Sequence, residues 1–124
     1  MSNNPKIFII KEQMVRNEVG SVPMDYSRAQ DYGDLEFITL HDLPMYSGRS
    51  STQEAWNEDV IRFVKMYDPA RDFIITTGQP AAIFMVGWIL GAMDPNKIPR
   101  FLVWRREEGR YRPLQPDVSS VTTH

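Results

Sequence analysis

The chain contains no cysteine and only two histidines, His41 and His124. The absence of thiols excludes disulfides, thiolate zinc sites and cysteine nucleophiles. Two histidines far apart in the sequence do not predict a metal site built from several imidazoles. We therefore expect no metal, no cofactor and no assembled catalytic group, which favours a protein that is not an enzyme.

The N-terminal residues MSNNPKIFII lack the long apolar stretch of a secretory signal, which predicts a cytoplasmic location. A chain of 124 residues with 42% hydrophobic and 24% charged residues is typical of one globular domain. We expect this domain to span residues 1–118, followed by a flexible tail over residues 119–124. The net charge of −2 gives no general attraction to nucleic acid.

A long stretch without charge, residues 73–93, has the length of a membrane span. Its middle reads Thr-Thr-Gly-Gln-Pro over residues 76–80, which is typical of a turn, and the apolar remainder is too short to cross a bilayer. The stretch therefore predicts a strand over residues 73–77 and a helix from about Pro80, not a membrane helix. Because this helix is apolar all round, we expect both of its sides to be covered.

The other elements follow from hydrophobic periodicity. Strands are expected over residues 6–11, 35–40, 100–106 and 111–115, a short helix after Asp25, and a long amphipathic helix from Ser51 to the YDP motif. Residues 11–23 are expected to form an exposed loop. Alternating strands and helices predict an α/β fold with a small, open, mostly parallel sheet of four or five strands, helices on its faces and a C-terminal β-hairpin.

The segment DYSRAQDYGDLEFITL resembles a pattern in a group of short, uncharacterised proteins of tailed bacteriophages. The matching residues are Asp25, Tyr26, Ser27, Ala29, Tyr32 and Gly33. These proteins also share a DFIITTG-type strand before an apolar helix, and a hairpin like that from Trp104 to Tyr111. The resemblance covers roughly residues 25–112 and implies an α/β fold and a phage protein in the cytoplasm of the infected host. It implies no activity.

The turn of Thr76, Thr77, Gly78 and Gln79 is one candidate ligand site. In an open α/β sheet, ligands bind beyond the carboxyl ends of the strands, and a helix N-terminus there offers free N–H groups to an anion. The turn lacks both the GxGxxG pattern and the lysine of a P-loop, so it favours no particular nucleotide chemistry. An ordinary strand–helix turn is the alternative interpretation.

Two further groups of polar residues are expected near the carboxyl ends of strands. Asp25, Tyr26 and Ser27 could face a ligand, although helix capping and packing would explain the same residues. His41 could act as a general base, but the adjacent Asp42 is expected to point to the opposite face, which weakens a direct relay.

The hairpin region is the candidate partner-binding surface, with Trp104, Arg105, Arg106, Arg110 and Tyr111. Aromatic residues and arginine are enriched where proteins bind proteins. Glu107 and Glu108 argue against nucleic acid because they repel phosphate. Charge pairing across an exposed hairpin is the simpler alternative.

These features favour a phage accessory protein that binds a host or phage protein without catalysis. Self-association through the edge of the hairpin would make it a homo-oligomer. The alternative is a binder or hydrolase of a nucleotide or other phosphorylated small molecule at the Thr76–Gln79 turn.

Overall fold

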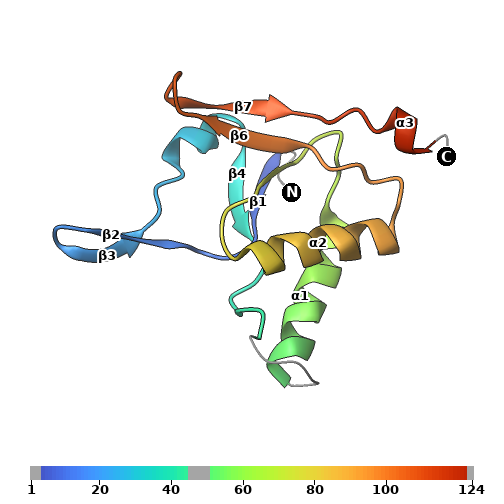
Figure 1. Cartoon of the computed structure of the whole chain (residues 1–124), viewed down its shortest axis with the longest axis horizontal. Coiled ribbons are helices and arrows are strands. Elements are labelled where there is room, and N and C mark those ends of the chain that lie inside the picture. Colours follow the sequence, from blue (N-terminus) through green and yellow to red (C-terminus); the bar gives the residue numbers. More distant parts are fainter. Residues whose placement is uncertain (1–3, 45–50, 123–124) are drawn as a thin grey trace.

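The computed structural model describes residues 4–44 and 51–122, and a five-stranded sheet lies at its centre (Figure 1). The strands, in the order of the sheet, are β4 (Asp34–Phe37), β1 (Lys6–Ile9), β5 (Phe73–Ile75), β6 (Phe101–Arg105) and β7 (Arg110–Leu114). The first four are parallel, and β7 runs antiparallel to β6. This arrangement confirms the predicted α/β fold with its mostly parallel sheet and C-terminal hairpin.

Two helices cover one face of the sheet, α1 (Ser51–Met66) and α2 (Pro80–Met93). Both begin where the sequence predicts them, and Pro80 occupies the first turn of α2, where its missing N–H removes no helical hydrogen bond. The helices and the sheet share one buried core. Its main members are Phe8, Ile74, Trp56, Val60, Phe63, Val64, Ala82, Val86 and Leu90.

The opposite face is covered by a short 3-10 helix, η1 (Ser27–Asp31), which buries Ala29 against the sheet. The predicted short helix after Asp25 is therefore present, but it is a 3-10 helix, and no side chain caps it. The Asp25 carboxylate instead accepts a hydrogen bond from the Ser27 N–H at 2.8 Å, a local turn that competes with a longer helix. After η1, a Cβ on Gly33 would lie 2.2 Å from the Pro5 carbonyl oxygen, so the chain needs glycine where it joins β4.

The segment predicted as an exposed loop forms a second, separate hairpin, β2 (Met14–Asn17) and β3 (Gly20–Pro23). Figure 1 shows it projecting away from the main sheet. The predicted exposure is confirmed, but the predicted lack of structure is wrong. A turn at Glu18 and Val19 closes the hairpin, with the Asn17 side-chain oxygen accepting the Val19 N–H at 2.9 Å and Gly20 at a φ of 122°.

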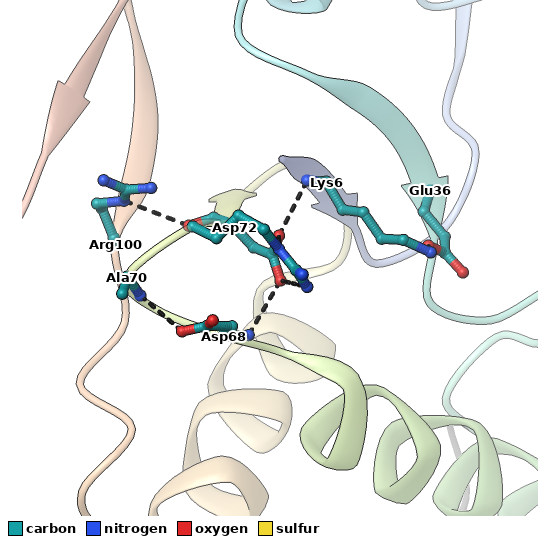
Figure 2. A network of polar contacts seen from close by, with 7 residues as sticks. Lys6, Glu36, Asp68, Ala70, Asp72 and Arg100 are labelled. Carbon is teal, nitrogen blue, oxygen red and sulfur yellow. Dashed lines mark hydrogen bonds and ion pairs between the residues drawn. The ribbon is translucent and has the colours of Figure 1, made fainter. Parts of the chain in front are cut away.

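The amino ends of β1 and β5 are fastened by a buried carboxylate, Asp72 (Figure 2). Asp72 accepts hydrogen bonds from the backbone N–H groups of Lys6 and Asp68, both at 3.0 Å. The Arg71 guanidinium adds two more, at 2.8 and 3.2 Å. Burial alone would raise the pKa of Asp72, but these donors outweigh it and the pKa lies below its usual value. Asp72 thus has a structural role at the amino ends of the strands, whereas the candidate ligand site lies at their carboxyl ends.

The outer side of α2 is exposed, although the sequence predicts that both sides of this helix are covered. Ala82, Val86 and Leu90 face the core, whereas Phe84 is 75% and Trp88 62% exposed. The helices form a single layer on the sheet, and no described element lies over this side of α2. In the described part of the chain, no helix has both the length and the apolarity needed to cross a membrane.

The last described element is one helical turn, α3 (Ser119–Thr122). It lies in the segment for which the sequence predicts a flexible tail. The boundary between a domain over residues 1–118 and this tail stays a prediction.

Candidate functional site

The switch point of the sheet lies between β1 and β5. From β1 the chain continues to β4 on one side, and from β5 it continues to β6 on the other. In open α/β sheets, ligands bind at such a point, beyond the carboxyl ends of the two strands. The residues that follow β1 and β5 therefore form the first place to look for a site.

The predicted turn over residues 76–79 lies there, between β5 and the start of α2. Gly78 has a φ of 122°, a conformation that favours glycine. The hydroxyls of Thr77 and Tyr26 form a hydrogen bond of 2.8 Å. Two of the side chains predicted to bind a ligand are thus hydrogen-bonded to each other. Their contact links the residue before η1 to the turn.

Gln13, which the sequence reasoning missed, lies over this turn. Its Nε2 would be 3.0 Å from a Cβ on Gly78, and it donates a hydrogen bond of 3.1 Å to the Lys11 carbonyl. The small cavity beside Gly78 and Gln79 measures only about 20 Å³. That volume holds about one water molecule, so a phosphate would require Gln13 to move.

Trp56 of α1 lines the same small cavity. Its side chain is 1% exposed, and its indole Nε1 has no hydrogen-bond partner among the residues that the structure describes. A buried donor without an acceptor is unfavourable. A buried donor on a residue that lines the cavity near the start of α2 favours a bound acceptor atom.

His41 lies next to this cavity, but its surroundings do not form a catalytic pair. The His41 backbone N–H donates to the Thr39 hydroxyl at 3.0 Å. The neighbouring carboxylate, Asp42, forms an ion pair with Lys11 at 3.2 Å. The side chain of Asp42 is therefore paired with a lysine. His41 and Asp42 both lie in the loop after β4 and line the same small cavity, so the alternation expected for a strand does not apply to them.

Asp25 and Ser27 lie on the exposed side of η1, whereas Tyr26 is buried and packs edge-on against Phe37. The hydrogen bond from the Ser27 N–H lowers the pKa of Asp25 below its usual value. Of these three residues, only Tyr26 reaches the turn of the candidate site. The contacts of Asp25 and Ser27 are those of a local turn.

A larger hollow of about 350 Å³, which the sequence did not predict, lies between β4 and α1. The apolar part of its lining includes Phe8 and Phe63. Three of its polar side chains are paired with each other, since Asp59 accepts a 2.8 Å hydrogen bond from Thr39 and forms an ion pair with Arg62. The candidate site residue His41 also lines the hollow. In the sequence, Asp59 and Arg62 belong to the polar side of α1, and nothing in their spacing indicates a hollow.

The aromatic side of the β6–β7 hairpin is held by contacts from η1 and from the turn that follows it. The rings of Trp104 and Tyr111 meet edge-on at 5.0 Å, and the Arg28 guanidinium lies 5.9 Å from the Trp104 ring. Arg28 also donates to the Gly109 carbonyl, and the Tyr32 hydroxyl donates to the Tyr111 carbonyl at 2.9 Å. Trp104 remains 45% exposed, whereas Tyr111, against which its ring packs, is buried.

The other side of the hairpin gathers arginines around one carboxylate. Glu108 pairs with Arg112 at 2.8 Å, with Arg110 at 3.4 Å and with Arg105 at 4.0 Å. The hydrogen bond from Arg112, aided by Arg110, lowers the pKa of Glu108 to about 2. The predicted charge pairing on the hairpin is thus present, but one carboxylate is shared by three guanidinium groups.

We define the hairpin patch as the exposed charged and aromatic residues at this end of the molecule. They are Arg28, Trp104, Arg105, Arg106, Glu107, Glu108, Arg110 and Arg112. Five arginines against two glutamates give the patch a net charge of +3, whereas the whole chain carries −2. The sequence identified the hairpin residues but not Arg28, which reaches the hairpin only through the fold. Over residues 4–44 and 51–122 there is no cluster of side chains suited to a metal ion.

Comparisons with known proteins give one match. The family model described as Phage Pam3 gp32-like protein matches residues 5–118, which include all five strands of the main sheet and both long helices. Neither the curated proteins nor the solved structures give a match. The family match confirms the resemblance to phage proteins, and the chain belongs to the Phage Pam3 gp32-like protein family.

Proposed function

We propose that this phage protein is an accessory protein that binds an acidic surface of a phage or host protein through the hairpin patch, in the cytoplasm of the infected cell. The observation that carries the proposal is the sharing of Glu108 by Arg105, Arg110 and Arg112. The single carboxylate neutralises only part of their charge. The remaining guanidinium donors are exposed and available to carboxylates of a partner.

The side chains of the hairpin patch are held in place within the free protein, which supports the proposal. Arg28 and Tyr32 fasten the hairpin to the rest of the fold, so the arginine and tryptophan side chains are placed before a partner arrives. Such preorganisation lowers the conformational entropy lost on binding. Trp104 and the arginines are also the residue types enriched in the energetically important centres of protein interfaces.

Charge reversal tests the proposal. Arg106 has no hydrogen bond or ion pair with the described residues, so Arg106→Glu removes a binding group without disturbing the fold. Arg16 lies exposed on β2, and Arg16→Glu changes the net charge equally at a distant place. A partner captured from infected cells by the wild type and by Arg16→Glu, but not by Arg106→Glu, is the expected result. Equal capture by all three proteins would refute the proposal.

The same experiment separates protein from nucleic acid. Both kinds of partner respond to salt and to charge reversal. Nuclease treatment of the lysate leaves the capture of a protein partner unchanged. A capture that disappears with nuclease would identify the patch as a nucleic-acid surface.

A second candidate function is the binding of a phosphorylated small molecule at the turn between β5 and α2. The Nε1 of buried Trp56, which has no hydrogen-bond partner among the described residues, favours it, whereas the cover provided by Gln13 opposes it. Gln13→Ala should open the site. A thermal-shift screen with nucleotides and sugar phosphates tests this function, since a ligand at 100 times its dissociation constant adds about 2.7 kcal/mol to the free energy of unfolding. No shift for either the wild type or Gln13→Ala would exclude it.

A further inference from the structure

The outer side of α2 is an uncharged, exposed helix surface. No residue from Gln79 to Met93 carries a charge. Phe84 and Trp88 lie one turn apart on the side opposite the core residues of the helix. Neither ring has an aromatic, cationic or hydrogen-bonded partner among the described residues. Large exposed apolar groups of this kind mark contact surfaces.

Two glycines lie beside these aromatic residues, Gly87 and Gly91. Glycine inside a helix is unfavourable relative to alanine. A Cβ added at either position would meet no atom within 4 Å, so no packing within this chain requires glycine there. The close approach of a helix from another molecule would explain these glycines, because the absence of a side chain lets two helix backbones come together.

The spacing of these four residues is self-complementary. If two copies of α2 pack antiparallel about a point between Gly87 and Trp88, Trp88 of one copy is level with Gly87 of the other. Phe84 is then level with Gly91 in the same arrangement. Phe84 thus meets a place without a side chain, and the two-fold symmetry repeats this contact, while Trp88 lies beside the symmetry axis next to Trp88 of the other copy. Antiparallel packing also brings opposite ends of the two helix dipoles together.

We propose that the outer side of α2 is the contact surface of a homodimer, in which two copies of the helix pack antiparallel. This surface is distinct from the hairpin patch. The edge of the hairpin is less suited to self-association, because the Tyr111 carbonyl is already bonded to Tyr32 and Pro113 has no N–H to donate.

The exposed area is enough for a weak dimer. An aromatic side chain buries roughly 150–250 Å². At 75% and 62% exposure, Phe84 and Trp88 offer roughly 250 Å² per copy. Stable interfaces bury about 600 Å² or more on each partner, so these two rings supply less than half, and the exposed residues Ala81 and Ala92 add to it. We therefore expect a weak dimer that forms only at high protein concentration.

Sedimentation of the full chain from micromolar concentrations to about 0.5 mM tests the proposal. The wild type should shift from monomer to dimer across this range. Trp88→Ser and Gly91→Leu should each weaken the dimer at least tenfold. Trp104→Ser, which removes the other exposed tryptophan, should leave the dimer unchanged. A wild type that stays monomeric throughout, or a dimer that survives Trp88→Ser, would overturn the proposal.

Gly91→Leu also distinguishes lost contact from lost folding. Because leucine is a better helix former than glycine and the position faces open space, this variant should unfold at the same or a higher temperature than the wild-type monomer. Dimer loss with an unchanged or raised melting temperature supports a contact at this position. A dimer as tight as the wild-type dimer would exclude it.

The absence of cysteine allows a clean test of the helix orientation. In the antiparallel arrangement, Ala81 of one copy lies about two residues, or roughly 3 Å along the axis, from Ala92 of the other. A short bifunctional thiol linker should therefore join Ala81→Cys to Ala92→Cys when the two variants are mixed, but should join neither variant to itself. Cross-linking within either single variant would contradict the antiparallel arrangement.

Discussion

The two hairpins of this protein are similar in length but are held in different ways. β2–β3 forms its own two-stranded sheet, and most of its side chains face solvent. β6–β7 belongs to the main sheet and is fastened to the rest of the fold by Arg28 and Tyr32 on one side, while on the other side Glu108 pairs with arginines of the hairpin itself. An isolated two-stranded hairpin is only marginally stable in water. The comparison shows that tertiary contacts, and not hairpin formation, order the surface to which we assign binding.

The largest difference between the hairpins should appear when a supporting side chain is removed. Tyr111 is buried beneath Trp104, so Tyr111→Ala should lower the free energy of unfolding by about 3 kcal/mol. Val15→Ala on the exposed β2–β3 hairpin should change it by less than about 0.5 kcal/mol. Urea denaturation of both variants measures the two values. Equal losses would show that the two hairpins are held alike.

A smaller effect is expected from a single tertiary hydrogen bond. Tyr32→Phe removes the donor to the Tyr111 carbonyl and should reduce the free energy of unfolding by about 1 kcal/mol. Amide hydrogen exchange should become faster in β7 and stay unchanged in β2 and β3. Acceleration in both hairpins would mean that this bond stabilises the whole fold evenly.

The smallest effect is a local dependence on pH. The pKa of Glu108 is lowered from its ordinary value of 4.5 to about 2 by its arginine partners. The stabilisation from this carboxylate is therefore fully present above about pH 4.5 and is lost as the pH falls through about 2. An NMR titration of the Glu108 carboxyl carbon should give a midpoint near 2. A midpoint near 4.5 would show that the arginines are not gathered around Glu108 in solution.

The sequence predicts the elements whose residues follow a strong period. Strands β1, β5 and β6 and helices α1 and α2 lie within two or three residues of their expected bounds because long apolar runs and prolines mark them. The β2–β3 hairpin was missed because its apolar residues are few and scattered among polar ones, and its turn, Asn-Glu-Val-Gly, lacks a strong hairpin signal. The uncovered side of α2 was missed because the composition of one helix does not reveal whether a second layer exists.

The contacts of the candidate sites were less accessible to sequence reasoning than the residues themselves. The turn and the hairpin were both located correctly. However, the bond from Tyr26 to Thr77, the cover of Gln13 over Gly78 and the stacking of Arg28 on Trp104 all join residues far apart in the chain. Such pairs are created by the strand order, and no local period records them.

The most direct test of the proposed function is the affinity of an isolated partner for three proteins. These are the wild type, Arg106→Glu on the hairpin patch, and Arg16→Glu on the other hairpin. We expect Arg106→Glu to weaken binding at least tenfold, a loss of about 1.4 kcal/mol, with the larger loss at low salt. Arg16→Glu should stay within about twofold of the wild type because it lies outside the patch. Equal affinities for all three proteins would contradict the assignment of binding to the hairpin patch.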